Sequence, residues 1–211
     1  MSLIEVKNIC KSYGEHKIFD KLSFDIDEND MIAILGASGK GKSTLLNIIG
    51  LIENYDSGDL IICGEKDIKP NSKKSSKMIR NNISYLFQNF ALVDNETVFQ
   101  NLMYALKYVD ISEKEKKSVI RKSLEEVGLS GYEKRKVFTL SGGEQQRIAI
   151  ARLFVNPKKI ILADEPTGSL DSHNRDSVMK YLRTLNEKGS TIVIVTHDEK
   201  VGDFCDRKIV I

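Results

Sequence analysis

Residues 36–43 read Gly36-Ala37-Ser38-Gly39-Lys40-Gly41-Lys42-Ser43. This octapeptide has the spacing G-x-x-x-x-G-K-[ST], and it lies between a continuous apolar run, Met31–Leu35, and an apolar-periodic stretch, Lys42–Leu51. A buried strand, a glycine-rich turn and a helix are the context in which this spacing forms an anion-binding loop. The backbone N–H groups of the loop would surround a phosphate, while Lys42 would reach its outer oxygens and Ser43 would offer a hydroxyl to Mg²⁺.

A second segment supplies carboxylates. The apolar run Ile160–Ala163 is followed directly by Asp164 and Glu165. At the end of a strand, Asp164 is placed to hold Mg²⁺ through water, and Glu165 is placed to face an attacking water molecule. Together the two segments predict a P-loop nucleoside triphosphatase, with adenylate-type kinases and GTPases as rival classes at this point.

Strand patterns alternate with helical patterns along the chain. Two segments with period-two alternation predict antiparallel, half-exposed strands, and continuous apolar runs predict buried ones. The expected strands are Ile4–Ile9, Leu22–Ile26, Met31–Leu35, Ile83–Phe87, Lys159–Ala163, Thr191–Thr196 and Arg207–Ile211, and the expected helices are Lys42–Leu51, Ser112–Val127, Gly143–Phe154 and Ser172–Glu187. We therefore expect an α/β fold: a P-loop core with a mostly parallel sheet flanked by helices, an antiparallel β part, and a helical sub-lobe at about 89–140 within one domain, 1–211.

Composition narrows the classes of partner. The 211 residues include 32 basic and 30 acidic side chains, a net charge of +2, which does not favour nucleic-acid binding. The cluster formed by Lys73, Lys74, Lys77 and Arg80 is interpreted mainly as a solvated face, with a partner surface as the alternative. The three cysteines lack a C-x-x-C spacing, so neither a disulfide framework nor a zinc site is expected. No signal peptide and no apolar run of about 20 residues is seen, so we expect no direct membrane insertion.

The most specific segment reads Leu140-Ser141-Gly142-Gly143-Glu144-Gln145-Gln146-Arg147. Two glycines at a helix start expose backbone N–H groups and Ser141 adds a hydroxyl, which makes a second anion-binding helix terminus. The segment resembles the signature motif of ATP-binding cassette (ABC) ATPases, and the resemblance extends over nearly the whole chain.

This resemblance implies a nucleotide site shared between two subunits, in which the phosphate loop of one and the signature of the other close on the same ATP. It implies catalytic roles for Glu165, His197, Gln88 and Lys42, with metal contacts from Ser43, Gln88 and Asp164. The implied nucleotide contacts are Tyr13, Gly36, Ala37, Ser38, Gly39, Lys40, Gly41, Lys42, Ser43, Thr44, Ser141, Gly142, Gly143 and Gln145. Tyr13 is similar to the aromatic residue that stacks on adenine. Lys40 departs from the family, and we expect its side chain to point to solvent.

The resemblance also implies partners. A second ABC subunit, expected to be an identical copy, would contact Asp171 in the loop Ser169-Leu170-Asp171. An integral membrane permease would hold the protein at the cytoplasmic face of the cell membrane. Phe90, Leu92 and Val93 are the candidates for the permease contact, together with Phe99, although their apolar character equally fits a core role.

Within this resemblance, the motifs that are present narrow the kind of ABC protein that is expected. It carries one phosphate loop and one signature, and the interval between them shows no sustained heptads, which excludes two-cassette translation factors and DNA-repair ATPases. Segments 46–51, 87–92 and 164–171 resemble the branch of macrolide exporters and lipoprotein-release complexes, and the C-terminal strand looks most like lactococcin-type bacteriocin exporters. We expect an ATP-hydrolysing subunit that drives export, of a bacteriocin or peptide. The alternative is a non-transport ABC ATPase that drives a membrane partner in cell-wall or division signalling.

Overall fold

The computed structural model describes residues 2–168 and 172–211. The chain forms two compact units. The first unit comprises Met1–Tyr85, Lys158–Glu165 and Asn186–Ile211, and the second comprises Leu86–Pro157 and Pro166–Leu185. Each unit is considered by itself below.

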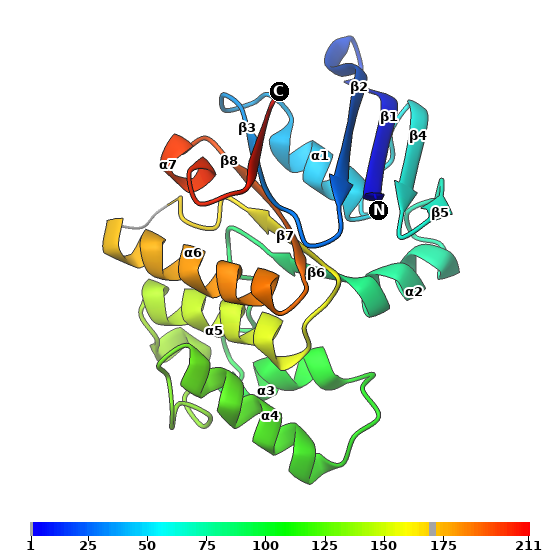
Figure 1. Cartoon of the computed structure of the whole chain (residues 1–211). Helices are drawn as coiled ribbons and strands as arrows, with labels where there is room; N and C mark the ends of the chain where they lie inside the picture. Colours follow the sequence, from blue (N-terminus) through cyan, green and yellow to red (C-terminus); the bar gives the residue numbers. More distant parts are fainter. Residues whose placement is uncertain (1, 169–171) are drawn as a thin grey trace. The chain divides into compact units, whose positions relative to one another are not determined.

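A five-stranded sheet forms the centre of the first unit (Figure 1). Its order is β6-β7-β8-β3-β9, and the strands are β3 (Met31–Leu35), β6 (Ile83–Leu86), β7 (Ile160–Asp164), β8 (Thr191–Thr196) and β9 (Arg207–Val210). Strand β3 pairs in parallel with β8 and β9, and β7 pairs in parallel with β8. All of β8 is buried, which explains its continuous apolar run. The register pairs Leu35 with Thr196 and Asp164 with Val195, so the ends of three strands meet at one edge of the sheet.

The antiparallel sheet of this unit has the order β2-β1-β4-β5. Its strands are β1 (Ser2–Tyr13), β2 (His16–Asp27), β4 (Ser57–Ile62) and β5 (Glu65–Lys66). The two strands expected here lie inside β1 and β2, whereas β4 and β5 were not expected. Strand β4 is hard to recognise because its apolar half is only Leu60–Ile62. Its other half includes Gly58, which has a φ of 104° and approaches the Asn8 carbonyl too closely for any Cβ.

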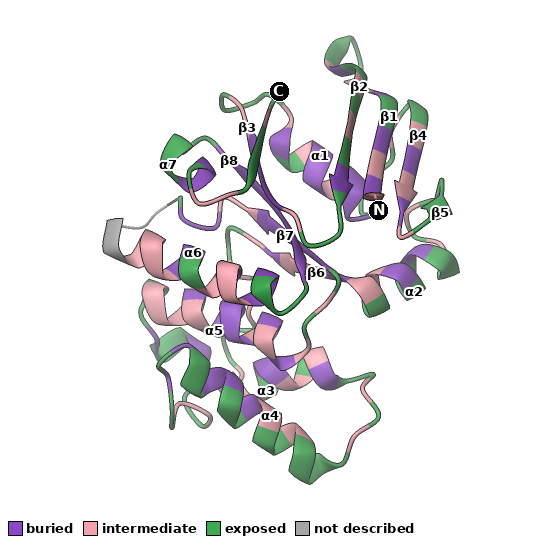
Figure 2. Cartoon of the chain, in the orientation of Figure 1, coloured by how far each residue is buried: buried purple, intermediate pink, exposed green. Residues whose placement is uncertain are grey.

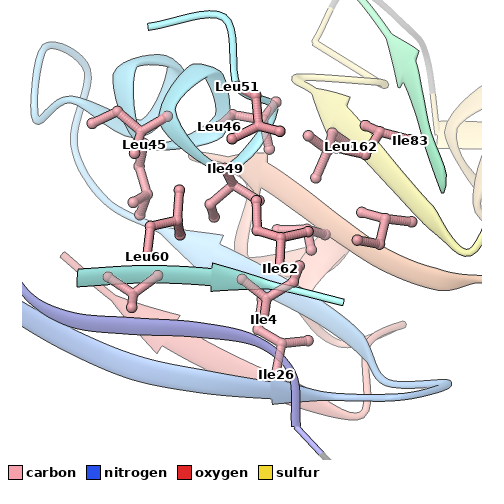
Figure 3. Close-up of a cluster of buried hydrophobic side chains, with 14 of the residues drawn as sticks. Ile4, Ile26, Leu45, Leu46, Ile49, Leu51, Leu60, Ile62, Ile83 and Leu162 are labelled. Atoms are coloured by element: carbon pink, nitrogen blue, oxygen red, sulfur yellow. The ribbon is translucent and has the colours of Figure 1, made fainter. Parts of the chain in front are cut away.

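Helix α1 (Lys42–Ile49) supplies the centre of the hydrophobic core. Its buried residues Leu45, Leu46 and Ile49 converge with Ile4 and Ile62 of the antiparallel sheet (Figure 3). Leu162 of β7 and Ile83 of β6 belong to the same cluster. One buried cluster therefore holds the helix that follows the phosphate loop against both sheets.

Two further helices complete the first unit. Helix α2 (Lys73–Asn82) is capped by Ser72 and buries Ser75 and Met78, and Figure 2 shows both buried and exposed stretches along it. Its basic residues are all exposed. Helix α7 (Glu199–Gly202) follows β8 and is capped by Asp198. The basic cluster between Pro70 and Asn82 thus lies on an exposed helix face, as the main interpretation of the sequence expected.

The second unit is helical. It contains α3 (Val98–Met103), η1 (Tyr104–Leu106), α4 (Glu113–Glu126), η2 (Val137–Thr139), α5 (Gly142–Val155) and most of α6 (Ser172–Glu187). Helices α3, α4 and α5 pack on one another. The sub-lobe expected at 89–140 lies within this unit, which also includes α5 and most of α6. Within residues 2–168 and 172–211, every helix is too short or too polar to cross a lipid bilayer.

Candidate functional site

The phosphate loop ends in a helix start that is open to an anion. Gly41 precedes α1 with a φ of 87°, and a Cβ at this position would lie 2.3 Å from Cγ2 of Ile18, so the position requires glycine. Helices α2, α3, α4 and α5 each carry a capping box, but no described side chain caps α1. The first N–H groups of α1 are therefore left for a ligand, as the motif predicts.

Lys42 lies inside the loop. Its side chain is only 7% exposed, and Nζ donates hydrogen bonds to the carbonyl oxygens of Gly36 (2.8 Å) and Ala37 (3.1 Å). The ammonium group is therefore held by loop carbonyls at the place where the motif predicts a phosphate. Lys40 is exposed, which agrees with the expectation that its side chain points to solvent.

Tyr13 lies at the end of β1, beside the start of α1. Its hydroxyl contacts Thr44 Oγ1 at 3.4 Å and donates a hydrogen bond to Glu53. Lys11 forms an ion pair with Glu53 (3.0 Å), and its Nζ lies 4.6 Å from the centroid of the Tyr13 ring. The ring is 49% exposed, so an aromatic surface lies next to the phosphate loop. Its stacking on adenine stays a prediction.

Ser43 and Asp164 meet at the edge of the parallel sheet. Ser43 Oγ donates a hydrogen bond of 3.1 Å to Asp164 Oδ1. Burial raises the pKa of Asp164, and the nearby charge of Glu165 adds to this, while the Ser43 hydrogen bond and Lys42 act in the opposite direction. Hydroxyl and carboxylate oxygens are the ligands that Mg²⁺ prefers, and a cation would offset the cost of the buried charge. These two residues therefore fit the ion that the motifs predict.

Glu165 is held in a strained backbone conformation. Its φ is 43°, in the left-handed region, which costs a non-glycine residue about 1–3 kcal/mol. Its N–H donates to the Val195 carbonyl (2.9 Å), Oε2 accepts from Thr196 Oγ1 (2.9 Å), and Oε1 lies 2.7 Å from His197 Nδ1. The carboxylate is thus held by two side chains, Thr196 and His197, while the Glu165 backbone is held by Val195. The structure therefore brings Glu165 and His197, for both of which catalytic roles were expected, into contact. His197 itself is 62% exposed.

Thr196 was missed by the sequence analysis. Its side chain is fully buried at the end of β8, and its hydroxyl donates to Glu165 and accepts from the Asp198 N–H (3.1 Å). It therefore positions the Glu165 carboxylate. The signal in the sequence was a hydroxyl residue that ends a buried strand directly before His197.

The signature segment forms the start of α5 in the second unit. Ser141 is its N-cap residue: Ser141 Oγ accepts from the Glu144 N–H (3.3 Å), and Glu144 Oε2 accepts from the Ser141 N–H (2.8 Å) and Oγ (2.9 Å). Space is open around Gly142 and Gly143, where added Cβ atoms would meet nothing within 4 Å. The spacing S-x-x-E would have predicted this capping box.

Two glutamines follow in α5. Gln145 was predicted to contact nucleotide, but its amide donates to the carbonyls of Leu140 (3.1 Å) and Val137 (3.4 Å). The amide of the buried Gln146, which the sequence analysis missed, donates to the carbonyl of Pro166, the residue that follows Glu165 in the chain. Both amides are therefore engaged within the second unit.

The remaining candidates lie in or after the turn that follows β6. Gln88 is exposed, and its metal contact stays a prediction. None of Phe90, Leu92 and Val93 is buried, and Val93 is 45% exposed, so the structure does not place them in the core. Asp171, the predicted dimer contact, lies outside the described residues.

Comparison with known proteins identifies the family. A family model for the ABC transporter matches residues 19–168, well over half of the chain. The chain belongs to the ABC transporter family. Its fold is that of an ABC cassette, a parallel five-stranded sheet with helices and an antiparallel four-stranded sheet, as the sequence predicted.

Two curated relatives of this ABC cassette differ in length. The macrolide export ATP-binding/permease protein MacB of Mannheimia succiniciproducens is 38% identical over 99% of this chain. The chain spans only 33% of the length of that relative, about a third of the curated MacB proteins that it matches. The uncharacterized ABC transporter ATP-binding protein YknY of Bacillus subtilis is also 38% identical, over 99% of this chain and 93% of its own length.

Solved structures agree with this assignment. The dimeric structure of MJ0796, a bacterial ABC transporter cassette, matches with a TM-score of 0.89 and 37% identity, covering 99% of this chain and 94% of that chain. A dimeric post-hydrolysis state of MJ0796 bound to ADP and Pi matches with a TM-score of 0.88, 35% identity and the same coverage. The chain is accordingly an ABC ATPase, an enzyme that hydrolyses ATP to ADP and phosphate.

Proposed function

We propose that this cassette is the energy-coupling subunit of an exporter. Two copies would bind head to tail around two ATP molecules and drive a separate membrane permease, which would hold them at the cytoplasmic face of the membrane. The observation that carries the proposal is that one chain has two helix starts with room for an anion: α1, which no described side chain caps, and α5, where the space around Gly142 and Gly143 is open. A single bound nucleotide needs only the first, so the second is available to the nucleotide of another copy.

Each of the predicted site residues would then take one part of the chemistry. Lys42 and the N–H groups of α1 would bind the phosphates, and Tyr13 would stack on the adenine. Ser43 and Asp164, with Gln88 as a third predicted ligand, would hold Mg²⁺, which when bound neutralises charge on the phosphate oxygens. Glu165 would orient the attacking water and take its proton. His197 would orient Glu165 and contact the γ-phosphate.

Mixing two inactive variants tests the shared site. Lys42→Ala removes the loop cation and Ser141→Arg fills the signature, so each variant alone should hydrolyse ATP at a few per cent of the parental rate. A mixed dimer holds one intact site, made from the loop of the Ser141→Arg chain and the signature of the Lys42→Ala chain. An equimolar mixture should therefore regain activity, and a mixture no more active than either variant would contradict a site shared between chains.

Fixed backbone and exposed apolar side chains support the permease contact. Arg152 donates to the carbonyls of Ala91 (2.6 Å) and Phe90 (2.9 Å). The buried Asn101 side chain bonds to both the N–H (2.8 Å) and the carbonyl (3.1 Å) of Val93. The segment thus presents apolar side chains on a firmly held backbone, which suits docking of an apolar segment of the permease.

Co-purification from native membranes tests which protein is the membrane partner. Tagged Glu165→Gln protein, solubilised with ATP, should retain a polytopic membrane protein. Val93→Asp, added to this Glu165→Gln protein, should abolish capture. Introduced alone into the parental chain, Val93→Asp should leave the rate of ATP hydrolysis unchanged. Val210→Asp, a change at a 77% exposed position in the first unit, is the matched control and should leave both unchanged. Capture that survives Val93→Asp would move the contact elsewhere.

The identity of the transported molecule depends on the membrane partner. We propose a bacteriocin or other peptide, supported by the resemblance of the sequence to lactococcin-type exporters, while the MacB relatives are named for macrolide export. A captured membrane protein with a peptide cargo would support this proposal. Capture of cell-wall or division factors would instead support the signalling function, with the ATPase chemistry unchanged.

A further inference from the structure

We propose that Glu144 is a gate on the signature. In the absence of ATP, the Glu144 carboxylate accepts the hydrogen bond of the Ser141 hydroxyl. Its negative charge also repels the γ-phosphate of the ATP that is bound to the partner copy. Glu144 therefore raises the ATP concentration at which two copies dimerise. This inference rests on the proposed function, because it assigns a regulator to the same shared site.

The first argument is the single proton of the Ser141 hydroxyl. Ser141 Oγ donates it to Glu144 Oε2 at 2.9 Å while accepting the Glu144 N–H at 3.3 Å. A hydroxyl donates one hydrogen bond, so Ser141 cannot donate to Glu144 and to a phosphate at once. The bond to Glu144 must break before the signature can bind the γ-phosphate through this group.

The second argument is charge. Glu144 Oε1 accepts from the Tyr132 hydroxyl (2.8 Å) and lies 3.6 Å from Arg135 Nη1, whose guanidinium stacks over the Tyr132 ring at 4.4 Å. Hydrogen bonds from the Ser141 backbone, Tyr132 and the Ser141 side chain lower the pKa of Glu144 to about 2. The carboxylate is thus charged at neutral pH and fixed in place. Bringing a γ-phosphate to the same helix start places like charges together.

The third argument comes from the other capping boxes in the chain. At α3, Gln100 Oε1 accepts from the Thr97 N–H (2.8 Å) and Oγ1 (2.9 Å), so a neutral amide completes the same motif. At α4, Glu115 Oε2 accepts from the Ser112 N–H (2.8 Å) and Oγ (2.6 Å). The cap of α5 therefore does not need a charge at position 144. A negative charge there affects ATP only because this helix start is the proposed phosphate site.

Glu144 is accordingly a positioning residue that acts through Ser141. Glu144→Gln should keep the cap, as Gln100 does at α3, while removing the charge that opposes the phosphate. A purely structural role would predict the opposite effect, because weakening a cap would weaken the dimer. The sign of the change therefore distinguishes the two roles.

The test is an ATP titration of dimerisation, followed by light scattering in the Glu165→Gln background. Glu144→Gln should lower the ATP concentration for half-maximal dimer by at least about threefold. The difference should shrink between 50 mM and 500 mM salt, because salt screens charge repulsion. Glu115→Gln, the same change in the matching box of α4, should leave the ATP threshold unchanged, and thermal unfolding should confirm that both variants are folded.

The outcomes separate the two proposals. If the Glu165→Gln protein dimerises with ATP but Glu144→Gln leaves the threshold unchanged or raises it, the gate is wrong and the proposed function stands. A threshold that falls equally with Glu115→Gln would also overturn the gate, since the effect would not depend on the signature. If the Glu165→Gln protein stays monomeric at saturating ATP, the shared site itself is wrong.

Discussion

Removing the Thr196 hydroxyl should slow ATP hydrolysis with little effect on ATP binding. Thr196→Val keeps the shape of this fully buried side chain but deletes the donor to Glu165 Oε2 (2.9 Å) and the acceptor of the Asp198 N–H (3.1 Å). A hydrogen bond to a charged group contributes about 1.5–3 kcal/mol. If that energy orients Glu165 in the transition state, the turnover number should fall about 10- to 100-fold, at about 1.4 kcal/mol per tenfold.

Single-turnover hydrolysis and nucleotide binding measure the two effects separately. The turnover rate of Thr196→Val should fall within the stated range, while its affinity for ATP should change less than about twofold, because the Thr196 hydroxyl bonds to Glu165 and to the Asp198 N–H. Thr196→Ser retains the hydroxyl and should restore most of the rate. Thermal unfolding should register a loss of about 1–3 kcal/mol for Thr196→Val, since a buried hydrogen bond is removed.

A parental turnover rate in folded Thr196→Val protein would refute this reasoning. It would mean that the contacts to His197 and to the Val195 carbonyl are enough to position Glu165. An equal loss in Thr196→Ser would also refute it, because the effect would then come from the methyl group and its packing.

Further predictions follow from other contacts. Tyr85 donates to the Leu46 carbonyl (2.7 Å), which also accepts the Gly50 N–H, so Tyr85→Phe should lower the free energy of unfolding by only about 1 kcal/mol in urea titrations. Gly50→Ala should cost more, because its Cβ would lie 1.8 Å from Tyr85 Oη. The pKa of Glu144 is lowered from 4.5 to about 2 in the folded chain, so the ionised carboxylate stabilises the fold above pH 4.5 and this stabilisation is lost as pH falls towards 2. In urea titrations, the difference in free energy of unfolding between the parental protein and Glu144→Gln should therefore become smaller from pH 4.5 to pH 2. A difference that stays constant over that range would contradict this. Ser43→Ala should raise the Mg²⁺ concentration needed for half-maximal hydrolysis about tenfold, measured at saturating ATP, and an unchanged requirement would remove Ser43 from the metal site.

The strands that could be predicted best from the sequence are those whose environment is uniform. Strands β3 and β8 match their expected bounds at both ends because they are buried runs without interruption. Helix α6 also matches at both ends. Helix α2 was recognised only as a basic face, since Ser75 and Met78 are its only buried residues and give no apolar periodicity.

The site was predictable as a set of motifs but not as a set of contacts. Both Ser43–Asp164 and Glu165–His197 were expected to cooperate, and each pair is in contact. The sequence marks Thr196 as a hydroxyl residue at the end of a buried strand, but it does not show the bond to Glu165, because that bond depends on the register of β7 and β8, which pairs Asp164 with Val195. The bond from Gln146 to Pro166 likewise links segments that are distant in the chain.

The most direct measurement is the mass and bound-nucleotide content of the Glu165→Gln protein by light scattering and nucleotide extraction. Loss of the proposed general base should let ATP bind without being hydrolysed. With MgATP the protein should have twice the mass of one 23.8 kDa chain and hold one ATP per chain, whereas with ADP it should be monomeric. A monomer that binds ATP without dimerising would contradict a nucleotide shared between the phosphate loop of one copy and the signature of another.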